Sequence, residues 1–457
     1  MSTFAPIENA EKQAQPETYC IVTYGCQMND NDSEIMAGIL EKQGLRRIEN
    51  EHDADVVLVN TCVVREGAEE RAVGRVQSLS TVKKQRGMII GVTGCMAQKE
   101  GENILKRLPH TDVVVGTRDL FKIDEIIQKA RTGGQPVVAT QDVDKPVFLG
   151  DQPVRRNHGQ KAFTTIMYGC NNFCSFCIVP KTRGREVSRP PDEIVRELQG
   201  LVSQGYQEVM LLGQNVNSYL HKGVDFADLL GIINQVDGLR RVRFMTSHPK
   251  DCSDKLIDAV AGLEKICTNM HLPVQAGSNR VLRRMKRFYT RDEYLDLVRR
   301  VRERIPFATI STDVIVGFPD ETDEDFEQTY ELLEAARWDS AYIFMYSPRE
   351  GTKSAQWLDS IPPEVKKHRV QRCIGRQEEI SAEINQTYQG RTVEVLVESI
   401  SKKREWEVMG RTVGDKCVIF PGGADLVGQL VNVEVTESHA HTLFGRLPVS
   451  AAVAASA

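Results

Sequence analysis

Three cysteines lie close together in the stretch YGCNNFCSFCIVP, residues 168–180, at positions Cys170, Cys174 and Cys177. Four-ligand zinc sites usually pair two Cys-x-x-Cys knuckles, and the sequence contains no second knuckle of this kind. Soft thiolates instead favour iron–sulfur clusters. A 4Fe-4S cluster held by three thiolates leaves one iron without a protein ligand. The spacing therefore predicts an iron that can bind a substrate or cofactor through nitrogen and oxygen.

A second group of cysteines is spread along the first hundred residues, at Cys26, Cys62 and Cys95. Each follows an apolar run by one to three residues, in TYGCQMN, VNTCVVRE and VTGCMAQ. In open α/β sheets, ligands bind outside the carboxyl ends of the strands. Three buried thiols are the alternative, because free cysteine is often buried. The neighbouring Gly, Thr and Asn residues favour a second, auxiliary cluster.

The elements that must position Cys26, Cys62 and Cys95 alternate between strand and helix. Short runs rich in Val and Ile predict strands, and one helix is expected in NDSEIMAGILEKQG, with Asp or Ser at its start and Gly44 as its stop. This alternation predicts a parallel sheet with helices on its faces. Proline and glycine in residues 132–160 predict an interdomain linker.

A second alternating series follows the linker and contains the cysteine loop. Six strand candidates with intervening helices, from FTTIMYG to SAYIFMYS, suit an open partial barrel rather than a closed eight-stranded one. After a long helix, five short strands with tight turns, from RTVEVLVES to HTLFGRL, predict a small antiparallel barrel. The fold class is therefore α/β with three domains.

Composition places the chain among folded globular proteins. Of its 457 residues, 41% are apolar and 26% are charged, with a net charge of −5. The start of the chain has no apolar leader and no later segment suits a membrane helix, so a cytoplasmic protein without a membrane partner is expected. Eleven cysteines in such a chain favour metal or redox chemistry over disulfides.

Charge is concentrated around the cysteine loop. Between Arg155 and Arg189 there are seven basic residues and one acidic residue, which gives +6. Such a field is either a solvated charged face or an attractor for a polyanion such as RNA, and charge alone does not decide between them.

The cysteine loop, placed after the first strand of a six-unit partial barrel, resembles the signature of the radical S-adenosylmethionine (radical SAM) superfamily. The resemblance implies that Cys170, Cys174 and Cys177 are catalytic cluster ligands and that the open iron chelates the methionyl end of SAM, whose cleavage gives a 5′-deoxyadenosyl radical. Further segments then become candidate SAM contacts. They are Gln214 and Asn215 in LLGQNVNS, Gln275, Ser278 and Arg287 in the segment beginning HLPVQAGS, and Ile315, Gly317 and Pro319 in IVGFP.

The whole chain from Thr18 to Leu447 is similar to the methylthiotransferases, and motifs such as TYGCQMNDNDSE, VPKTRGREVSRP and TSHPKD are closest to the MiaB-type tRNA enzymes. The resemblance implies an N-terminal methylthiotransferase domain at 17–132, a radical SAM core at 156–387 and a TRAM RNA-binding barrel at 388–451. Two 4Fe-4S clusters are implied, one binding SAM and one auxiliary on Cys26, Cys62 and Cys95.

The implied reaction is methylthiolation of carbon 2 of isopentenylated adenosine next to the tRNA anticodon. One SAM would methylate a sulfur on the auxiliary cluster, and a second would provide the radical. The implied partners are a tRNA anticodon stem-loop and an electron donor protein, and the chain is expected to act as a monomer. The alternatives are methylthiolation of threonylcarbamoyl adenosine or of a ribosomal protein, and a non-catalytic iron–sulfur RNA-binding scaffold.

Two positions depart from the family pattern. Ala276 stands where serine is usual, which removes a hydroxyl near the expected SAM pocket, and Lys181 replaces a common aromatic residue. In the barrel, Trp406 and the run from Lys402 to Arg404 suggest base stacking and phosphate contact. His248, His271, His439 and His441 are expected to be structural or to contact substrate, because hydrogen abstraction by a radical needs no general base.

Overall fold

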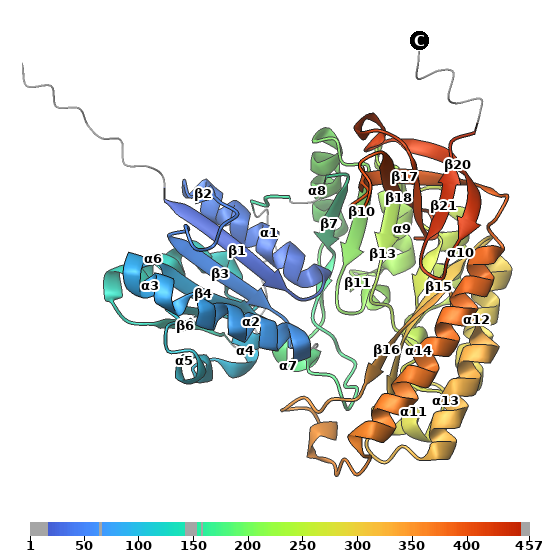
Figure 1. Ribbon diagram of the computed structural model, residues 1–457, viewed down its shortest axis with the longest axis horizontal. Helices are drawn as coiled ribbons and strands as arrows, with labels where there is room; N and C mark the ends of the chain where they lie inside the picture. The colour runs from blue at the N-terminus through green and yellow to red at the C-terminus, as the bar shows by residue number, and fades with distance from the viewer. Residues whose placement is uncertain (1–16, 64–65, 142–152, 157–158, 449–457) are drawn as a thin grey trace, which may run out of the picture. The chain divides into compact units, whose positions relative to one another are not determined.

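The computed structural model describes residues 17–63, 66–141, 153–156 and 159–448 (Figure 1). The described chain forms two compact units, which we describe separately. The first contains residues up to 141 together with 153–155, and the second contains residue 156 and residues 159–448.

The first unit is built on a six-stranded parallel sheet in the order β2-β1-β3-β4-β5-β6 (Figure 1, blue). Its strands are β1 (Thr18–Tyr24), β2 (Arg46–Arg47), β3 (Val56–Thr61), β4 (Ile89–Gly94), β5 (Val113–Val115) and β6 (Val137–Ala139). The order reverses at β1, because β2 lies on one side of it and β3 on the other. This makes the β1/β3 boundary a topological switch point, where open α/β sheets bind ligands.

Hydrophobic packing holds this sheet between helices. Helices α1 (Gln27–Lys42) and α6 (Ile123–Gly133) pack on the face that carries Val56 and Leu58. Val57 and Val59 alternate with these residues along β3 and are equally buried, so the opposite face is covered as well. Helix α2 (Glu66–Ser78) contacts β3 and β1.

Two details of this unit correct the expectations. Part of the expected linker at residues 132–160 is strand β6, which pairs with β5 at the edge of the sheet, and residues 142–152 lie outside the described chain. Helix α1 begins at Gln27, earlier than the Asp and Ser residues expected to cap it, and its N-cap is Cys26. A short run, Val137–Ala139, was missed because proline and glycine just before it indicated a loop.

The second unit contains six parallel strands in sequence order, in two three-stranded sheets. They are β7 (Lys161–Thr165), β10 (Glu208–Leu212), β13 (Arg241–Phe244), β14 (Asn269–His271), β15 (Thr309–Val316) and β16 (Ser340–Met345). A parallel bridge between Val242 and Ile266 joins the two sheets just before β14. This arrangement is the predicted open partial barrel.

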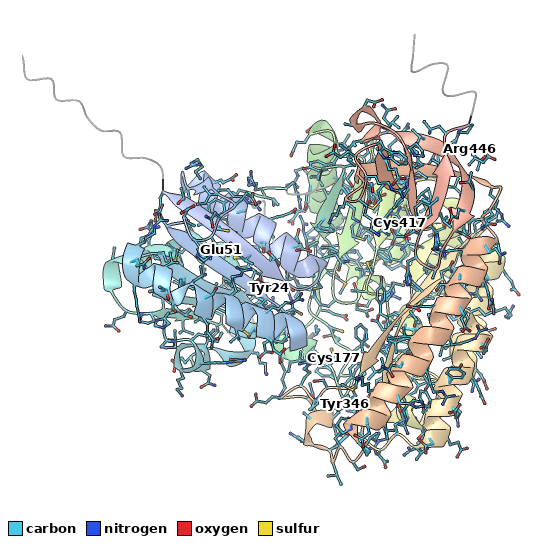
Figure 2. The ribbon with its side chains drawn as sticks, viewed as in Figure 1. Tyr24, Glu51, Cys177, Tyr346, Cys417 and Arg446 are labelled. Atoms are coloured by element: carbon cyan, nitrogen blue, oxygen red, sulfur yellow. The ribbon has the colours of Figure 1, made fainter. Side chains whose placement is uncertain are left out.

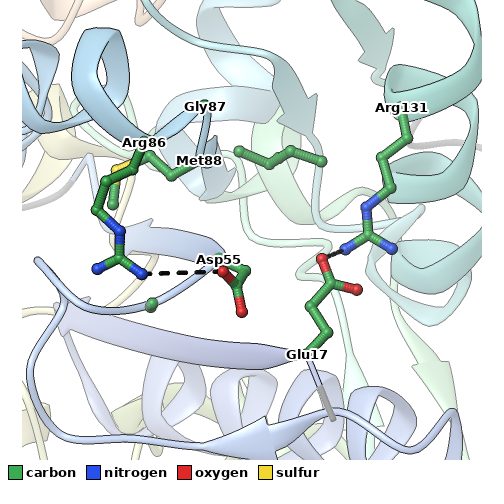
Figure 3. Close-up of a pocket in the computed structure, with 8 residues that line it drawn as sticks. Glu17, Asp55, Arg86, Gly87, Met88 and Arg131 are labelled. Carbon is green, nitrogen blue, oxygen red and sulfur yellow. Dashed lines mark hydrogen bonds and ion pairs between the residues drawn. The ribbon is translucent and has the colours of Figure 1, made fainter. Parts of the chain in front are cut away.

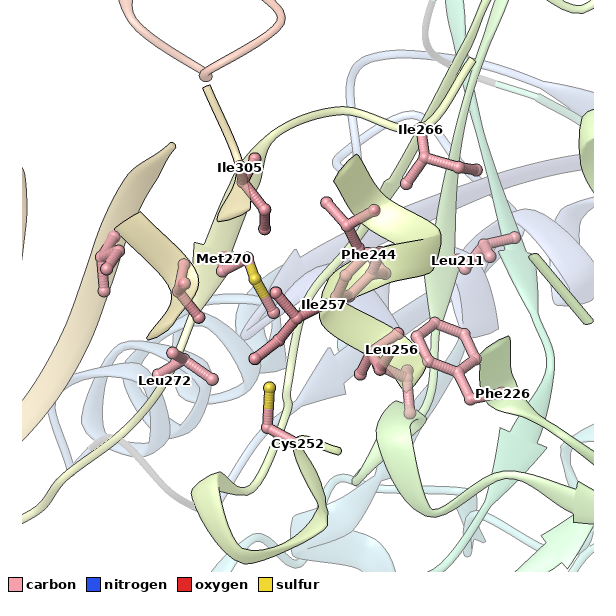
Figure 4. Packing of buried hydrophobic residues seen from close by; sticks show 14 of the residues in the cluster. Leu211, Phe226, Phe244, Cys252, Leu256, Ile257, Ile266, Met270, Leu272 and Ile305 are labelled. Carbon is pink, nitrogen blue, oxygen red and sulfur yellow. The ribbon is translucent and has the colours of Figure 1, made fainter. Parts of the chain in front are cut away.

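Helices follow these strands and share one apolar core with them. They are α8 (Pro191–Ser203), α9 (Phe226–Asn234), α10 (Asp254–Gly262), α12 (Arg291–Arg304), α13 (Asp323–Ala336) and α14 (Pro363–Gln386). Figure 4 shows part of this core, where the rings of Phe226 and Phe244 meet edge to face with centroids 5.1 Å apart. The core fixes the backs of the strands and leaves their carboxyl ends free to carry loops.

The predicted small barrel is closed, in the order β17-β18-β19-β21-β20. It is antiparallel except between β19 and β21, which pair in parallel, so the expectation of a wholly antiparallel barrel is corrected here. Its strands are β17 (Thr392–Ile400), β18 (Glu407–Thr412), β19 (Cys417–Pro421), β20 (Leu430–Ser438) and β21 (Leu443–Arg446). Valines 395, 397, 408, 418 and 433 fill its interior.

The turn between β18 and β19 docks against the amino ends of the parallel strands. Arg243, which is 0% exposed, donates to the carbonyls of Thr412 at 2.7 Å and Val413 at 3.1 Å, and to Glu208 at 2.8 Å. Thr309 at the start of β15 donates to the carbonyl of Gly414 at 2.6 Å. These buried hydrogen bonds join the small barrel to the partial barrel in one unit.

Candidate functional site

The cysteine loop follows β7 and the short strand β8 (Met167–Tyr168), at the carboxyl end of the partial barrel. Cys170 donates its N–H to the carbonyl of Gly184 at 3.0 Å, and Cys177 donates its N–H to the carbonyl of Cys174 at 3.1 Å. Burial raises the pKa of Cys170 to about 11, and burial together with the nearby Cys174 raises that of Cys177 to about 12. The loop therefore gathers three mutually interacting thiols (Cys177 is labelled in Figure 2).

Gly169 is required by the fold of this loop. Its φ is 76°, and a Cβ at this position would lie 2.0 Å from the carbonyl oxygen of Arg185. The N–H of Gly169 also donates to the Oε1 atom of Gln214. The residue before the first cysteine thus brings the loop against the neighbouring strand end.

A buried arginine lies against the second cysteine. Arg287 is 5% exposed and donates from Nη1 to the Sγ atom of Cys174 at 3.4 Å. Its Nη2 donates to the carbonyl of Pro273 at 2.7 Å, and its Nε donates to the hydroxyl of Tyr289 at 2.9 Å. The guanidinium of Arg287, held by these two further hydrogen bonds, therefore fixes the position of the Cys174 sulfur.

Gln214 and Asn215 follow β10, next to the loop. Because Gln214 already accepts from Gly169 through Oε1, its open group is the Nε2 donor. Asn215 donates from Nδ2 to Asp251 at 2.9 Å, and its Oδ1 acceptor has no hydrogen-bond partner among the described residues. The two amides therefore present one donor and one acceptor to a ligand.

The other expected SAM contacts are placed as follows. Gln275 has a left-handed backbone, with φ of 74°, and its N–H donates to the carbonyl of Asp313 on β15 at 2.8 Å. The hydroxyl of Ser278 is already used, because it donates to Asp325 at 2.5 Å and caps helix α11 (Asn279–Met285). Ile315, half-buried on β15, donates its N–H to the carbonyl of Gln275 at 2.8 Å.

Gly317 and Pro319 lie just beyond β15 and are both buried. A Cβ on Gly317 would lie 2.5 Å from the side chain of Lys366 on α14, so the fold itself excludes a larger residue. Ala276 packs in an apolar cluster with Val281, Leu282 and Phe318. A serine there would bury its hydroxyl among apolar groups, which accounts for the small apolar residue at this position.

The scattered cysteines meet at one edge of the first unit. Cys26 follows β1, Cys62 follows β3 and Cys95 begins helix α4 (Cys95–Glu100) directly after β4, and these three strands are neighbours in the sheet. Hydrogen bonds with Cys26 and Cys95, together with burial, raise the pKa of the Cys62 thiol far above its usual value. Cys62 therefore contacts both of the other thiols at the carboxyl edge of the sheet.

The buried side-chain amides of Asn29 and Asn60 lie beside this group of cysteines. Asn60, the residue before the last of β3, donates to the carbonyl of Asn29 at 2.8 Å and to the hydroxyl of Ser33 at 2.9 Å. Asn29 donates to Asn60 at 3.1 Å, and its Oδ1 lies 3.4 Å from the sulfur of Cys26. Both asparagines are 0% exposed. Asn60 is the Asn of the VNTCVVRE motif, whereas Asn29 had no expected role.

Gly94 is the last residue of β4 and directly precedes Cys95. Its φ is 89°, and a Cβ would lie 2.3 Å from the Oδ1 atom of Asn60. Gly-Cys pairs at 25–26, 94–95 and 169–170 were a signal in the sequence that these cysteines end strands in tight turns.

The donor chemistry of both groups fits iron–sulfur clusters. Each group offers three thiols, and within the described chain no set of three or more His, Cys, Asp or Glu side chains surrounds a single metal ion. Thiolates that each bind a different iron of one cluster need not converge on one point, so these two observations agree.

A separate polar pocket lies at the opposite end of the first sheet (Figure 3). Its lining includes Glu17, Asp55, Arg86 and Arg131. Arg131 pairs with Glu17, and Arg86 lies 4.0 Å from Asp55, so its charges are already balanced. It is a structural ion-pair site.

Comparisons with known proteins identify the class first. Residues 164–333 match the family described as Radical SAM superfamily, residues 18–116 match Uncharacterized protein family UPF0004, and residues 386–447 match the TRAM domain. The radical S-adenosylmethionine methyltransferase TsrM from Kitasatospora setae, solved with cobalamin and a 4Fe-4S cluster, shares the fold with a TM-score of 0.54 at 15% identity. That match covers 74% of each chain. Fold and cysteine loop thus define a radical SAM enzyme, which uses a 4Fe-4S cluster and SAM.

Curated relatives narrow the assignment. Proteins from Clostridium novyi (45% identical, covering 96% of this chain and 99% of the relative) and Thermoanaerobacter pseudethanolicus (47% identical, covering 94% and 92%) are both named tRNA-2-methylthio-N(6)-dimethylallyladenosine synthase. The chain therefore belongs to the tRNA-2-methylthio-N(6)-dimethylallyladenosine synthase family.

These findings confirm the predicted fold class and the methylthiotransferase resemblance, and they favour the isopentenyladenosine interpretation over the alternative substrates and the scaffold. The boundaries 17–132, 156–387 and 388–451 and the individual ligand assignments stay predictions. Across the described residues, no helix combines the length and apolar character needed to cross a membrane.

Proposed function

We propose that this chain methylthiolates carbon 2 of isopentenylated adenosine in tRNA, at the position next to the anticodon. The observation that carries the proposal is the pair of three-cysteine groups, one in a single loop and one at three neighbouring strand ends, in a chain of this family. A single radical SAM site would need only the first group. The second group indicates a sulfur-inserting reaction rather than simple radical cleavage.

We infer distinct roles for the two groups. Cys170, Cys174 and Cys177 hold the SAM-binding 4Fe-4S cluster, which supplies a reducing electron and hence a 5′-deoxyadenosyl radical when loaded. Cys26, Cys62 and Cys95 hold an auxiliary 4Fe-4S cluster. The electron comes from a donor protein.

The chain's own side chains prepare the SAM site. Arg287 fixes the orientation of the Cys174 sulfur through its 3.4 Å contact. Gln214 offers a donor to the methionyl carboxylate, and Asn215 offers an acceptor to the ammonium group. A backbone hydrogen bond joins Ile315 to Gln275 and holds the segment after β14 against the end of β15, where the adenosyl group would bind.

The closed barrel is the expected tRNA-binding module. Trp406 is 58% exposed, and the guanidinium of Arg404 lies 5.4 Å from its ring centroid. An exposed indole beside basic residues suits base stacking and phosphate contact. The barrel as a whole has seven basic and eight acidic residues from 387 onward, so the RNA contact is a local patch around Trp406.

Anaerobic reconstitution with iron and sulfide, followed by SAM, a reductant and an isopentenylated anticodon stem-loop, tests the proposal. We expect 5′-deoxyadenosine and methylthiolated RNA, detected by mass spectrometry of nucleosides. The same RNA without the isopentenyl group is the control and should give little product. Deoxyadenosine without any methylthiolated RNA would indicate another substrate, and no deoxyadenosine at all would indicate a scaffold.

A further inference from the structure

Four buried polar atoms in the loops after β10 and β13 have no hydrogen-bond partner among the described residues. They are Nε2 of Gln214, Oδ1 of Asn215, Oγ of Ser247 and Nε2 of His248. Buried polar groups without a partner are rare in folded proteins, and a cluster of them in adjacent loops requires an explanation. The first two belong to the expected SAM site, whereas His248 was expected to be structural or to contact substrate and Ser247 had no expected role.

The tautomer of His248 follows from its neighbours. The backbone N–H of Lys250 donates to Nδ1 of His248 at 3.2 Å, so the proton of the neutral ring is on Nε2. The backbone of His248 is fixed on both sides by the side chain of Asn217, at 2.9 Å and 2.8 Å. A rigid ring that is 5% exposed thus presents one N–H donor that has no acceptor among the described residues.

The loop that carries His248 is strained. Thr246 has φ of 67°, a left-handed backbone that a β-branched residue rarely adopts. Its hydroxyl donates to the carbonyl of Gly213 at 2.7 Å, and its carbonyl accepts from Val216 at 3.1 Å, which holds the strained turn against the β10 loop. Strain of this kind persists where surrounding contacts impose it, and it is concentrated at functional sites.

His248 is also close to the cysteine loop. Its ring meets that of Tyr289 edge to face, with centroids 5.7 Å apart. The hydroxyl of Tyr289 accepts from Arg287, which in turn donates to Cys174. The open donor of His248 therefore lies one aromatic ring away from the arginine that contacts a cluster ligand.

We propose that the Nε2–H group of His248 donates a hydrogen bond to an oxygen of SAM and that the hydroxyl of Ser247 belongs to the same subsite. This inference rests on the proposed function, because it assumes that SAM binds at the Cys170 loop. SAM offers carboxylate and ribose oxygens as acceptors, and His248 selects the productive pose by holding one of them.

The protonation state of the ring suits this ligand. Burial, with smaller contributions from Arg287 and Lys250, lowers the pKa of His248 to about 2. A neutral imidazole donates a hydrogen bond without placing a second positive charge beside the sulfonium of SAM.

Equilibrium dialysis of SAM against the reconstituted protein, with its clusters kept oxidised, tests the subsite without turnover, because no electron is then available to cleave SAM. We expect His248→Leu to raise the dissociation constant for SAM by about tenfold. His248→Gln retains an N–H donor and should stay within about threefold of the wild type, and Ser247→Ala should weaken binding by about threefold. Thr268→Val is the matched control, because Thr268 Oγ1 is also buried without a hydrogen-bond partner in the described chain but precedes β14, at the opposite strand ends.

Iron content and melting temperature establish that each variant is folded and loaded. Dissociation constants within twofold of the wild type for both His248→Leu and Ser247→Ala would overturn the inference. Weakened SAM binding in the variants, together with a wild-type protein that makes no methylthiolated RNA, would support the subsite and reject the proposed function. Normal binding in variants of an active enzyme would reject the subsite alone. Methionine and 5′-deoxyadenosine, tested as separate ligands, identify which half of SAM accepts the hydrogen bond.

Discussion

The two cysteine groups each supply three thiols, but the chain brings these thiols together in different ways. Cys170, Cys174 and Cys177 lie in one short loop, so local backbone geometry is sufficient to bring them together. Cys26, Cys62 and Cys95 come from three strands and meet only when β1, β3 and β4 have paired. The first group is thus a local feature of the chain, and the second is a product of the folded sheet.

Removing one cysteine from each group should give the largest effects. Cys174→Ala is expected to lower 5′-deoxyadenosine formation by about 1000-fold or more, because three ligands act as a unit. Cys95→Ala should leave SAM cleavage in place but abolish methylthiolated RNA. Both variants should fall from about eight to about four iron atoms per chain. Equal loss of SAM cleavage in the two variants would contradict the division of roles.

Substituting the glycine before a cysteine tests how each group is built. Gly94→Ala and Gly169→Ala both impose a left-handed backbone on alanine and a clash, at 2.3 Å and 2.0 Å respectively. We expect each to lower the free energy of unfolding by about 1–3 kcal/mol from backbone strain alone, measured by urea unfolding. Gly74→Ala in α2 is the control. Its Cβ would meet nothing within 4 Å, so a gain of about 0.5–1 kcal/mol is expected.

The group at Cys26, Cys62 and Cys95 should depend on the buried amides of Asn29 and Asn60. The group in the 170–177 loop should not. Asn60→Ala leaves partners of a fully buried network without hydrogen bonds, which should cost about 1–3 kcal/mol. Hydrogen exchange should rise in β1 and β3 but not in the partial barrel. Asn103→Ala, an exposed position in the same unit, should be silent. A uniform rise in exchange over both units would argue against this local role.

Acid should lower the stability of the second unit through His248. Because its pKa is about 2 in the folded chain and near 6.5 when unfolded, the unfolded state takes up a proton below pH 6.5 that the folded state refuses. The contribution of this group is complete above pH 6.5 and declines as pH falls, by about 1.4 kcal/mol per pH unit. Between pH 5 and 7, His248→Gln should show a correspondingly shallower loss of melting temperature for the second unit. An unchanged slope would show that this ring is protonated in the folded chain.

Sequence patterns predicted those features that depend on local chemistry. The strands before Cys26, Cys62 and Cys95 were predictable because each is a short run that contains β-branched residues and is followed by a loop or helix start. The closed barrel was predictable for the same reason, from five strands without helices between them.

Features that depend on contacts distant in sequence were not predictable. Strand β6 was hidden because Val137–Ala139 is only three residues long and follows a Gly-Pro-rich turn. Gln214 was expected to contact SAM, but its oxygen is used by Gly169, 45 residues away, and no periodicity reveals that contact.

The buried Arg243 has a consequence for substrate choice. It holds the β18–β19 turn against the strand ends of the partial barrel that lie opposite the cysteine loop. A strand rises about 3.3 Å per residue, so the length of the parallel strands sets a fixed distance between this turn and the loop. If the barrel binds tRNA and the loop holds SAM, as proposed, this distance would limit which adenosines of a bound tRNA can reach the radical.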